Sequence, residues 1–542
     1  MNTFSLLNAE IQEVLGKTFS IPTEPQELAI PPILEGKDVL LIAPTGSGKT
    51  EAAVLPVFHK ILEDKERNRE EKGFYALYIT PLRALNRDML FRLEKWGDQL
   101  GINIEVRHGD TTSYARRRQA LKPPDLLITT PETIQAIIPG KRLRESLKSV
   151  RYVIIDEVHE LANSKRGAQL AIALERIAEL AGEFQRICLS ATVGNPEEVA
   201  KFFAGHKKMQ VVNTVSTKTI EIDVLSPESR KKDEKDAKDF AVDHEVLSHV
   251  RTIKAVVKEG KSSLIFVNTR RAAEMLASLI NKFERGLIGV HHGSLSKEMR
   301  IEAEEKLKKG VIKGLICTSS MELGIDIGSI DTVIQYASPR EVTRLVQRVG
   351  RASHFVQKTS AGKVIALTPD DVAESLVIAK RAREGKIEDV KLKERSLDVL
   401  ANQICGVLLD HGVISLDKLH SLIRRAYPFR NIYFDAMIRV IEQLEEEGLV
   451  KREGEKIRRS KSTRSYYYEN LSMIPDERKY EVYDIVSGKL ICMLDERFVL
   501  NFAAPGALFV AKENFRCFHP LFYFPLLFLL EVYGRAVPYG RM

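Results

Sequence analysis

The stretch DVLLIAPTGSGKT, residues 38–50, decides the fold expected of this chain. Its first half is an uninterrupted apolar run, typical of a buried parallel strand, and a helical segment follows its glycine-containing turn. The backbone N–H groups of such a turn cradle phosphate oxygens at the positive end of the helix dipole. The expected loop comprises Ala43, Pro44, Thr45, Gly46, Ser47, Gly48, Lys49 and Thr50. Ala43 stands where the G-x-x-x-x-G-K pattern has its first glycine.

Further apolar runs follow the loop, each separated from the next by a polar stretch long enough for a helix. This alternation predicts a doubly wound α/β domain with a parallel sheet. The runs are YALYIT ending at Thr80, DLLITT at Thr130, YVIID at Asp156 and RICLSAT at Thr192. Because such sheets bind ligands at the carboxyl ends of their strands, we expect the polar residues at these ends to converge on one edge: Thr80, Thr130, Asp156 and Ser190.

A second series of apolar runs indicates a second α/β domain. SLIFVNT, LIGVHHG, KGLICTS, TVIQYA and KVIALT alternate with helical segments, and three helices then precede a basic stretch and the strand-like segment YYYEN. Three helices and a hairpin suggest a winged helix. The expected divisions are residues 1–210 for the first α/β domain, 211–245 for a charged linker, 246–390 for the second α/β domain, 391–470 for the winged helix and 471–542 for a partial β-rich region.

Composition places the chain among globular proteins with a small basic excess. Its 542 residues suffice for three or four domains. Lys and Arg number 82 against 74 Asp and Glu, a formal net charge of +8 that permits a polyanionic partner without requiring one. The five cysteines show no C-x-x-C spacing, and the N-terminus lacks the pattern of a signal peptide. We therefore expect a cytoplasmic protein without a membrane segment.

The final segment, FHPLFYFPLLFLLEVYGRAVPYGRM, differs in composition from everything before it. Its apolar run at residues 521–530 is shorter than the ~20 residues that cross a bilayer. Two interpretations stay open. The reading frame is truncated or frameshifted and leaves the β-rich region incomplete, or the segment packs onto the winged helix.

Four residues have the chemistry of nucleoside triphosphate hydrolysis. In a phosphate-binding loop, Lys49 reaches the β- and γ-phosphates and the Thr50 hydroxyl binds Mg²⁺. Asp156, at the end of a buried strand, is expected to bind the same ion. Glu157 is placed to orient the attacking water. The alternatives are a structural glycine turn and a surface pair of acids, and the buried-strand context disfavours both.

Nine motifs in a fixed order resemble those of superfamily 2 helicases of the DExH type. They are Gln26, APTGSGKT, TPLRAL, TTPET, DEVH, SAT, IFVNTRR, TSSMELGIDI and QRVGR, within about residues 20–370. The combination of VLLIAPTGSGKTEAAVLP, IDEVHEL, SSMELGIDIG and LVQRVGRASH is most similar to the large helicase-related (Lhr) family. The resemblance implies two tandem RecA-like domains followed by a winged helix and a further β-rich region.

The resemblance also implies roles for single residues. Gln26 would read the adenine edge, Gln347 would lie near the γ-phosphate, and Arg351 would act as an arginine finger from the second domain. His159, Ser190 and Thr192 would couple the nucleotide site to the nucleic-acid track. The resemblance does not imply an arginine-finger role for the neighbouring Arg348. Ser353 and His354 stand where the wider superfamily often has glycine and arginine, so a second finger is not implied.

Two groups of residues are candidates for nucleic-acid contacts. Strand-end hydroxyls and arginines suit phosphate contacts that ignore base identity. These candidates are Arg83, Thr130, Arg271 and Thr318, and the alternative for each is a helix cap or a surface arginine. The segment KREGEKIRRSKSTRSYYY, from Lys451, combines basic and aromatic residues and contains Arg458, Arg459 and Lys461. Its alternative is a solvated hairpin. Asp410 and His411 lack the further acid–histidine cluster of a nuclease.

The sequence therefore predicts an ATP- and Mg²⁺-dependent helicase that moves along one strand beside a duplex, with DNA favoured and a role in repair or recombination. The alternatives are an RNA-remodelling helicase and an ATP-gated nucleic-acid clamp that does not unwind. The motifs do not identify a protein partner.

Overall fold

The computed structural model forms two compact units, each built from two segments of the chain. Residues Met1–Ser216 and Glu388–Pro475 form the first unit, and Thr217–Ile387 and Asp476–Met542 form the second. The structure describes residues 2–16, 21–44, 46–67, 73–81, 83–214, 220–240, 242–322, 328–352, 360–473, 479–484, 490–495, 498–499, 508–511, 514–520 and 528–531.

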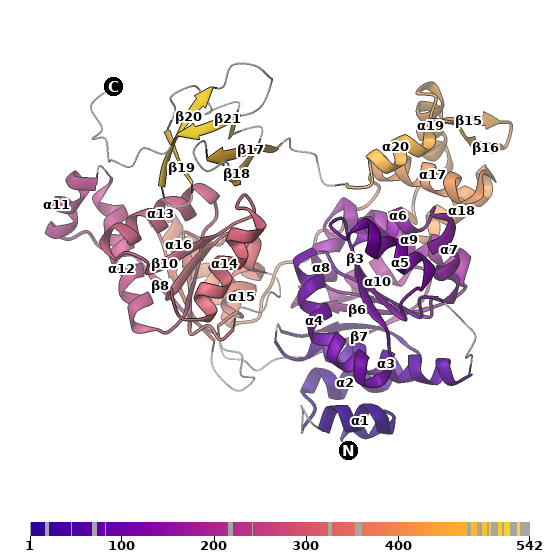
Figure 1. The fold of residues 1–542 in the computed structure, drawn as a ribbon, viewed down its shortest axis with the longest axis horizontal. Coiled ribbons are helices and arrows are strands. Elements are labelled where there is room, and N and C mark those ends of the chain that lie inside the picture. The colour runs from indigo at the N-terminus through magenta and orange to yellow at the C-terminus, as the bar shows by residue number, and fades with distance from the viewer. Residues whose placement is uncertain are drawn as a thin grey trace. The chain divides into compact units, whose positions relative to one another are not determined.

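The first unit contains a 7-stranded parallel sheet in the order β3-β4-β2-β5-β6-β1-β7. Figure 1 labels β3, β6 and β7 of this sheet among the helices of the unit. Its strands are β1 (Asp38–Ile42), β2 (Ala76–Ile79), β3 (Ile104–Arg107), β4 (Leu126–Thr129), β5 (Tyr152–Ile155), β6 (Gln185–Ser190) and β7 (Met209–Asn213). The runs that the sequence predicts as strands form β1, β2, β4, β5 and β6, which are buried along their whole length. The doubly wound sheet predicted for this domain is present.

Helices cover both faces of this sheet. They are η1 (Thr3–Leu6), α1 (Ala9–Gly16), α2 (Glu24–Leu34), α3 (Lys49–Arg67), α4 (Arg83–Leu100), α5 (Ser113–Leu121), α6 (Pro131–Ile137), α7 (Lys141–Ser146), η2 (Leu147–Ser149), α8 (Val158–Ala162), α9 (Lys165–Ala181) and α10 (Pro196–Ala204). Alternate residues of one strand point to opposite faces, so Leu40 packs into one hydrophobic cluster and Leu41 into the other.

The winged helix belongs to the same unit and shares a hydrophobic core with the first sheet. Its elements are α17 (Leu397–His411), β14 (Val413–Ser415), α18 (Leu416–Arg425), η4 (Tyr427–Phe429), α19 (Phe434–Glu446), β15 (Val450–Glu453), β16 (Lys456–Arg459) and α20 (Thr463–Glu469). The hairpin β15–β16 forms within the basic stretch. The expectation of a strand at YYYEN is wrong, because its first four residues lie in α20, Asn470 is the C-cap of that helix, and Tyr467 packs into the core shared with the first sheet.

The second unit contains a parallel sheet in the order β10-β11-β9-β12-β13-β8. Its strands are β8 (Ile220–Leu225), β9 (Ser263–Phe266), β10 (Ile288–His291), β11 (Gly314–Cys317), β12 (Thr332–Tyr336) and β13 (Ser360–Ile365). Its helices are α11 (Lys231–Phe240), α12 (His244–Glu259), α13 (Arg270–Phe283), α14 (Lys297–Lys308), η3 (Ser319–Met321), α15 (Val342–Val349) and α16 (Pro369–Arg383).

The range expected as a charged linker, 211–245, contains β8 and the charged helix α11.

A small sheet in the order β18-β17-β21-β20-β19 also belongs to the second unit. Its strands are β17 (Lys479–Asp484), β18 (Leu490–Asp495), β19 (Leu508–Ala511), β20 (Asn514–Pro520) and β21 (Phe528–Glu531). Within the residues that the structure describes, no helix is long and apolar enough to span a membrane.

Candidate nucleotide and nucleic-acid sites

The phosphate-binding loop connects β1 to α3 at the carboxyl edge of the first sheet. Gly46 and Gly48 have φ of +75° and +86°, a left-handed region that favours glycine. A Cβ on Gly48 would lie 2.5 Å from Nε2 of Gln26, so the end of the Gln26 side chain would have to shift. Ala43 donates its N–H to the Ser190 carbonyl oxygen at 3.2 Å, which fixes the start of the loop against β6. Thr45 lies outside the described residues.

Lys49 is the first residue of α3, and its side chain is buried. Within the described residues, its Nζ has no hydrogen-bond partner. A buried ammonium without a partner is costly, and an anion held by the surrounding loop amides would compensate it. The arrangement therefore fits a bound phosphate chain. Thr50, the next residue, is half-buried in the first turn of the helix.

Asp156 and Glu157 follow β5 and are both buried. Tyr78 donates its hydroxyl hydrogen to Asp156 Oδ2 at 2.8 Å, and the Glu157 N–H donates to Asp156 Oδ1 at 2.9 Å. Burial, reinforced by the Glu157 carboxylate, raises the pKa of Asp156 to about 6, whereas the Lys49 ammonium acts in the opposite direction. Two buried acids beside an ammonium favour a further cation, so the donor set fits Mg²⁺.

Glu157 has φ of +50°, a conformation that non-glycine residues rarely adopt. This strained residue lies between Asp156, the metal-binding candidate, and α8. Backbone strain of this kind is concentrated at functional sites. His159 Nδ1 lies 3.6 Å from Glu157 Oε2 and forms a 3.2 Å hydrogen bond with Ser190 Oγ. Burial lowers the pKa of His159. These contacts connect the ends of β5 and β6, and Thr192 lies half-buried just beyond Ser190.

Gln26 is buried at the start of α2, with both ends of its amide engaged. Its Oε1 accepts the Thr23 N–H at 2.9 Å, and its Nε2 donates to the Gly48 carbonyl oxygen at 3.5 Å. The Thr23 hydroxyl donates to the Ser47 carbonyl oxygen at 2.9 Å. Gln26 therefore supports the phosphate-binding loop in this structure. The sequence T-E-P-Q has the S/T-x-x-E/Q spacing of a capping box, which could have predicted this role.

The ends of β2 and β4 form the other half of the same edge. Thr130 caps α6 by accepting the Thr133 N–H at 3.4 Å, so its hydroxyl has the structural role that the sequence left open. Arg83 is the first residue of α4, but its side chain lies outside the described part. Arg166, which sequence reasoning missed, bonds both to the Pro81 carbonyl oxygen and to Glu132 across these two strand ends.

In the second unit, Arg271 and Thr318 follow the neighbouring strands β9 and β11. Arg271 is exposed on the first turn of α13, and Thr318 is half-buried before η3. Thr318 directly follows β11, as Thr130 directly follows β4 in the first sheet, whereas Arg271 lies on the helix that follows β9.

The candidate arginines of QRVGR differ in their surroundings. Arg348 is buried in α15, where its Nε donates to Glu322 Oε1 at 2.8 Å and its guanidinium also bonds to Gln335. Arg348 therefore has a structural role, consistent with leaving it out of the finger assignment. Arg351 donates a hydrogen bond to the Glu322 carbonyl oxygen at 2.5 Å. Gln347 is half-buried, while Ser353 and His354 lie outside the described residues.

The basic candidates of the winged helix are exposed. Arg458 and Arg459 lie in β16, and Lys461 follows it. Arg458 forms an exposed ion pair with Glu453 at 2.5 Å. Asp410 instead forms ion pairs with Arg144 at 3.0 Å and Arg176 at 2.8 Å, which attach α17 to the first domain.

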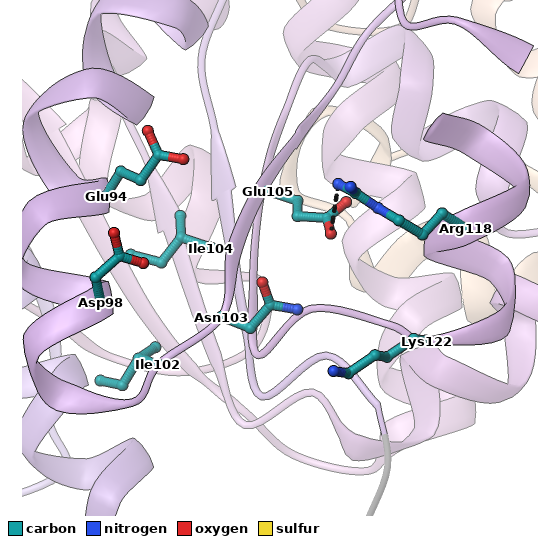
Figure 2. A pocket seen from close by; sticks show the side chains of 8 residues that line it. All are labelled: Glu94, Asp98, Ile102, Asn103, Ile104, Glu105, Arg118 and Lys122. Carbon is teal, nitrogen blue, oxygen red and sulfur yellow. Dashed lines mark hydrogen bonds and ion pairs between the residues drawn. The ribbon is translucent and has the colours of Figure 1, made fainter. Parts of the chain in front are cut away.

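A cavity of about 310 Å³ lies beside the edge strand β3 (Figure 2). Glu94 and Asp98 from α4 line one side, and Arg118 from α5 and Lys122, which follows α5, line the other. Arg118 pairs with Glu105 at 3.0 Å. No residue predicted from the sequence as part of a site lines this cavity.

Comparison with known proteins supports the motif resemblance along most of the chain. Three family models match in order: DEAD/DEAH box helicase at residues 23–199, helicase conserved C-terminal domain at 246–355, and the winged helix domain of the large helicase-related protein at 380–519.

Individual relatives agree with these matches. ATP-dependent helicase Lhr-Core protein 2 of Thermococcus barophilus is 38% identical over 542 aligned residues, covering 94% of this chain and 62% of that protein. ATP-dependent helicase Lhr-Core of Sulfolobus acidocaldarius is 38% identical, covering 94% and 60%. The solved structure of Mycobacterium smegmatis helicase Lhr bound to ssDNA and AMP-PNP matches with a TM-score of 0.76 at 34% identity, over 89% of this chain and 64% of that one. The chain spans about three fifths of the length of the curated relatives it matches.

Proposed function

The chain belongs to the Lhr family of superfamily 2 DExH helicases, and from this premise we propose that it is an ATP-dependent motor that moves along one strand of nucleic acid and separates the adjoining duplex. We further propose DNA, or one strand of an RNA–DNA hybrid, as its track and repair or recombination as its setting. The observation that carries the proposal is the buried Lys49 ammonium, without a partner among the described residues, beside the buried acids Asp156 and Glu157.

The nucleotide site would work by fixed electrostatics. The loop amides and Lys49 hold the phosphates, while Thr50 and Asp156 would hold Mg²⁺. When bound, this ion neutralises charge on the β- and γ-phosphates. Glu157 accepts a hydrogen bond from the attacking water and directs it at the γ-phosphorus in line with the leaving oxygen.

Charge that develops on the γ-phosphate needs a further cation, which Arg351 of the second domain would supply. Gln347, one helical turn earlier, would hold the water or the γ-phosphate oxygens. Because Arg351 belongs to the other unit, hydrolysis would depend on closure of the two domains. Closure would thereby couple the chemistry to strand movement.

The track would follow the carboxyl ends of β2 and β4 in the first sheet and of β9 and β11 in the second. Arg83, Thr130, Arg271 and Thr318 would contact phosphates. Such contacts do not read bases, as a motor that moves along any sequence requires. The hydrogen bond between His159 of α8 and Ser190 at the end of β6 would relay the state of the nucleotide to this edge.

The test is to measure ATP turnover and unwinding on matched DNA, RNA and hybrid forks, with Lys49→Ala as the inactive control. We expect strand-stimulated turnover and unwinding with DNA or a hybrid. Preference for RNA forks would identify an RNA-remodelling helicase. Stimulated turnover without unwinding on any fork would identify an ATP-gated clamp. Absence of stimulation by every strand would refute the proposal.

A further inference from the structure

Arg166, the second residue of α9, makes three contacts through one guanidinium group. Its Nε donates to Glu132 Oε1 at 2.5 Å and its Nη2 to Glu132 Oε2 at 3.1 Å. The same Nη2 donates to the Pro81 carbonyl oxygen at 2.7 Å. The side chains of Arg166 and Glu132 are only 15% and 23% exposed, so water screens the pair weakly. The bidentate fork fixes the direction of the guanidinium plane.

These contacts join two loops that are distant in sequence. Pro81 follows β2 and precedes α4, whereas Glu132 lies in the first turn of α6, two residues after its cap Thr130. Strands β2 and β4 are neighbours, with Ile79 paired to Thr129. Helices α6 and α9 pack against each other on the same sheet (Figure 1). Arg166, which lies on α9, therefore links the segment after β2 to the segment after β4.

We propose that Arg166 is a positioning residue for strand binding: it sets the distance between the loops after β2 and β4. The inference rests on the proposed function, because these loops carry the track candidates Arg83 and Thr130. Contacts to successive phosphates depend on the spacing of the groups that make them, and a shift of about 1 Å weakens a network assembled for one geometry. Pairing also neutralises Glu132, whose free carboxylate would repel phosphates.

The location of α9 gives this role a physical link to the nucleotide site. Arg166 lies seven residues after His159, with only the short helix α8 and the Ser164 cap between them. A displacement of α8 on hydrolysis would therefore move the guanidinium and both loops that it holds. No direct contact of Arg166 with the strand is required.

The test compares Arg166→Lys with wild type in strand-stimulated ATP turnover. The substitution keeps the charge and removes the planar fork, so it releases one of the two loops. We expect the strand concentration for half-maximal stimulation to rise about tenfold, while maximal stimulated turnover changes less than about threefold. Adding Glu132→Gln to Arg166→Lys should weaken strand binding by less than the sum of the single effects.

Arg430→Lys is the matched control, because Arg430 also joins a carboxylate, Glu394 at 2.9 Å, to a backbone carbonyl oxygen, that of Tyr427 at 2.7 Å. We expect this control to lower the melting temperature comparably and to leave half-maximal stimulation unchanged. A lower melting temperature of Arg166→Lys, with an unchanged strand concentration for half-maximal stimulation, would overturn the inference. The proposed function would be unaffected by that result.

The salt dependence of strand affinity separates positioning from direct contact. A residue that binds a phosphate itself contributes about 0.7 to 0.9 to the slope of log affinity against log salt. We expect Arg166→Lys and Arg166→Ala to lower affinity and retain the wild-type slope. A slope reduced by about one contact in Arg166→Ala would make Arg166 a ligand of the strand and overturn the positioning role. A wild type that no strand stimulates would refute the proposed function itself, and the inference with it.

Discussion

The carboxyl edge of the first sheet has two halves with opposite chemistry. At the ends of β1 and β5, one half holds the buried ammonium of Lys49 and the buried carboxylates of Asp156 and Glu157. At the ends of β2 and β4, the other half contains the neutral hydroxyls of Thr80 and Thr130, which are also buried, and the Arg166 guanidinium, which is paired with the Glu132 carboxylate.

The difference reflects what each half is proposed to hold. A triphosphate occupies one fixed place during its reaction, and charges in a poorly hydrated site stabilise it strongly. A polymer that slides must leave each contact as readily as it forms it, so neutral donors suit it better than buried point charges. The first half should therefore respond to single substitutions far more than the second.

Removal of the buried ammonium tests the charged half and should give the largest effect. Lys49→Ala leaves the γ-phosphate without its P-loop cation, so turnover should fall below detection, by more than about 10³. Lys37→Ala is the control, since this lysine lies just before β1 and forms an exposed pair with Glu35 at 2.6 Å. Turnover of Lys49→Ala close to that of wild type would contradict the assignment of the site.

Arg351→Ala tests whether the charged half is completed from the second domain. Strand-stimulated turnover should fall by about 10³ to 10⁵ while nucleotide affinity stays near normal, because a finger acts only on the reacting state. Arg351→Lys should restore little, since an ammonium lacks the planar fork. His354→Ala should cost less if one finger suffices.

Turnover and melting temperature should be measured on the same preparation of each Arg351 variant. The structural alternative is that Arg351 serves mainly to hold the Glu322 carbonyl oxygen in its own domain. In that case alanine would lower the melting temperature and leave the turnover of folded molecules intact, and the finger would be refuted.

Thr130→Asp tests the neutral half. Aspartate caps helices as well as threonine does, so α6 should stay intact, but a carboxylate at this strand end repels phosphates. We expect strand affinity to fall about tenfold, with the melting temperature changed by only a few degrees. Ser415→Asp, at the cap of α18, is the control and should leave strand affinity unchanged. If the two variants behave alike, Thr130 is a cap alone.

Neutralising Arg458, Arg459 and Lys461 together should have the smallest effect per residue. These side chains are exposed, so each lost phosphate contact should reduce the salt slope by about 0.7 to 0.9 and weaken binding similarly for all sequences. Affinity titrations at several salt concentrations check this prediction. An unchanged slope would make the wing a solvated hairpin.

The charged half of the edge was largely predictable from sequence, because buried parallel strands are continuous apolar runs and their ends carry the site. Strands β3 and β7 were missed, since both lie at edges of the sheet and have partly exposed, mixed sequences. The strand predicted at YYYEN is a helix because Tyr467 is buried against the first domain. This packing outweighs the β propensity of tyrosine, on which the prediction rested.

Partners distant in sequence were not predictable. Tyr78 bonds to Asp156 across 78 residues, and Arg166 reaches Glu132 across 34. No local pattern marks such pairs, because they are set by which strands become neighbours. The half of the edge at the ends of β2 and β4 is held together by such a pair, that of Arg166 and Glu132. Its arrangement could therefore be described only from the structure.

The attachment of the winged helix has a consequence for synthesis on the ribosome. In α9, Arg176 pairs with Asp410 and Glu175 pairs with Arg425. These partners are translated 234 and 250 residues later, respectively. At about 5 to 20 residues per second, the first domain emerges about 10 to 50 seconds before its partner. During that interval the uncovered surface of α9 includes charged groups that water solvates well. An entirely apolar surface would hold the finished domains together, but it would expose every nascent chain to association with its neighbours on the same messenger RNA.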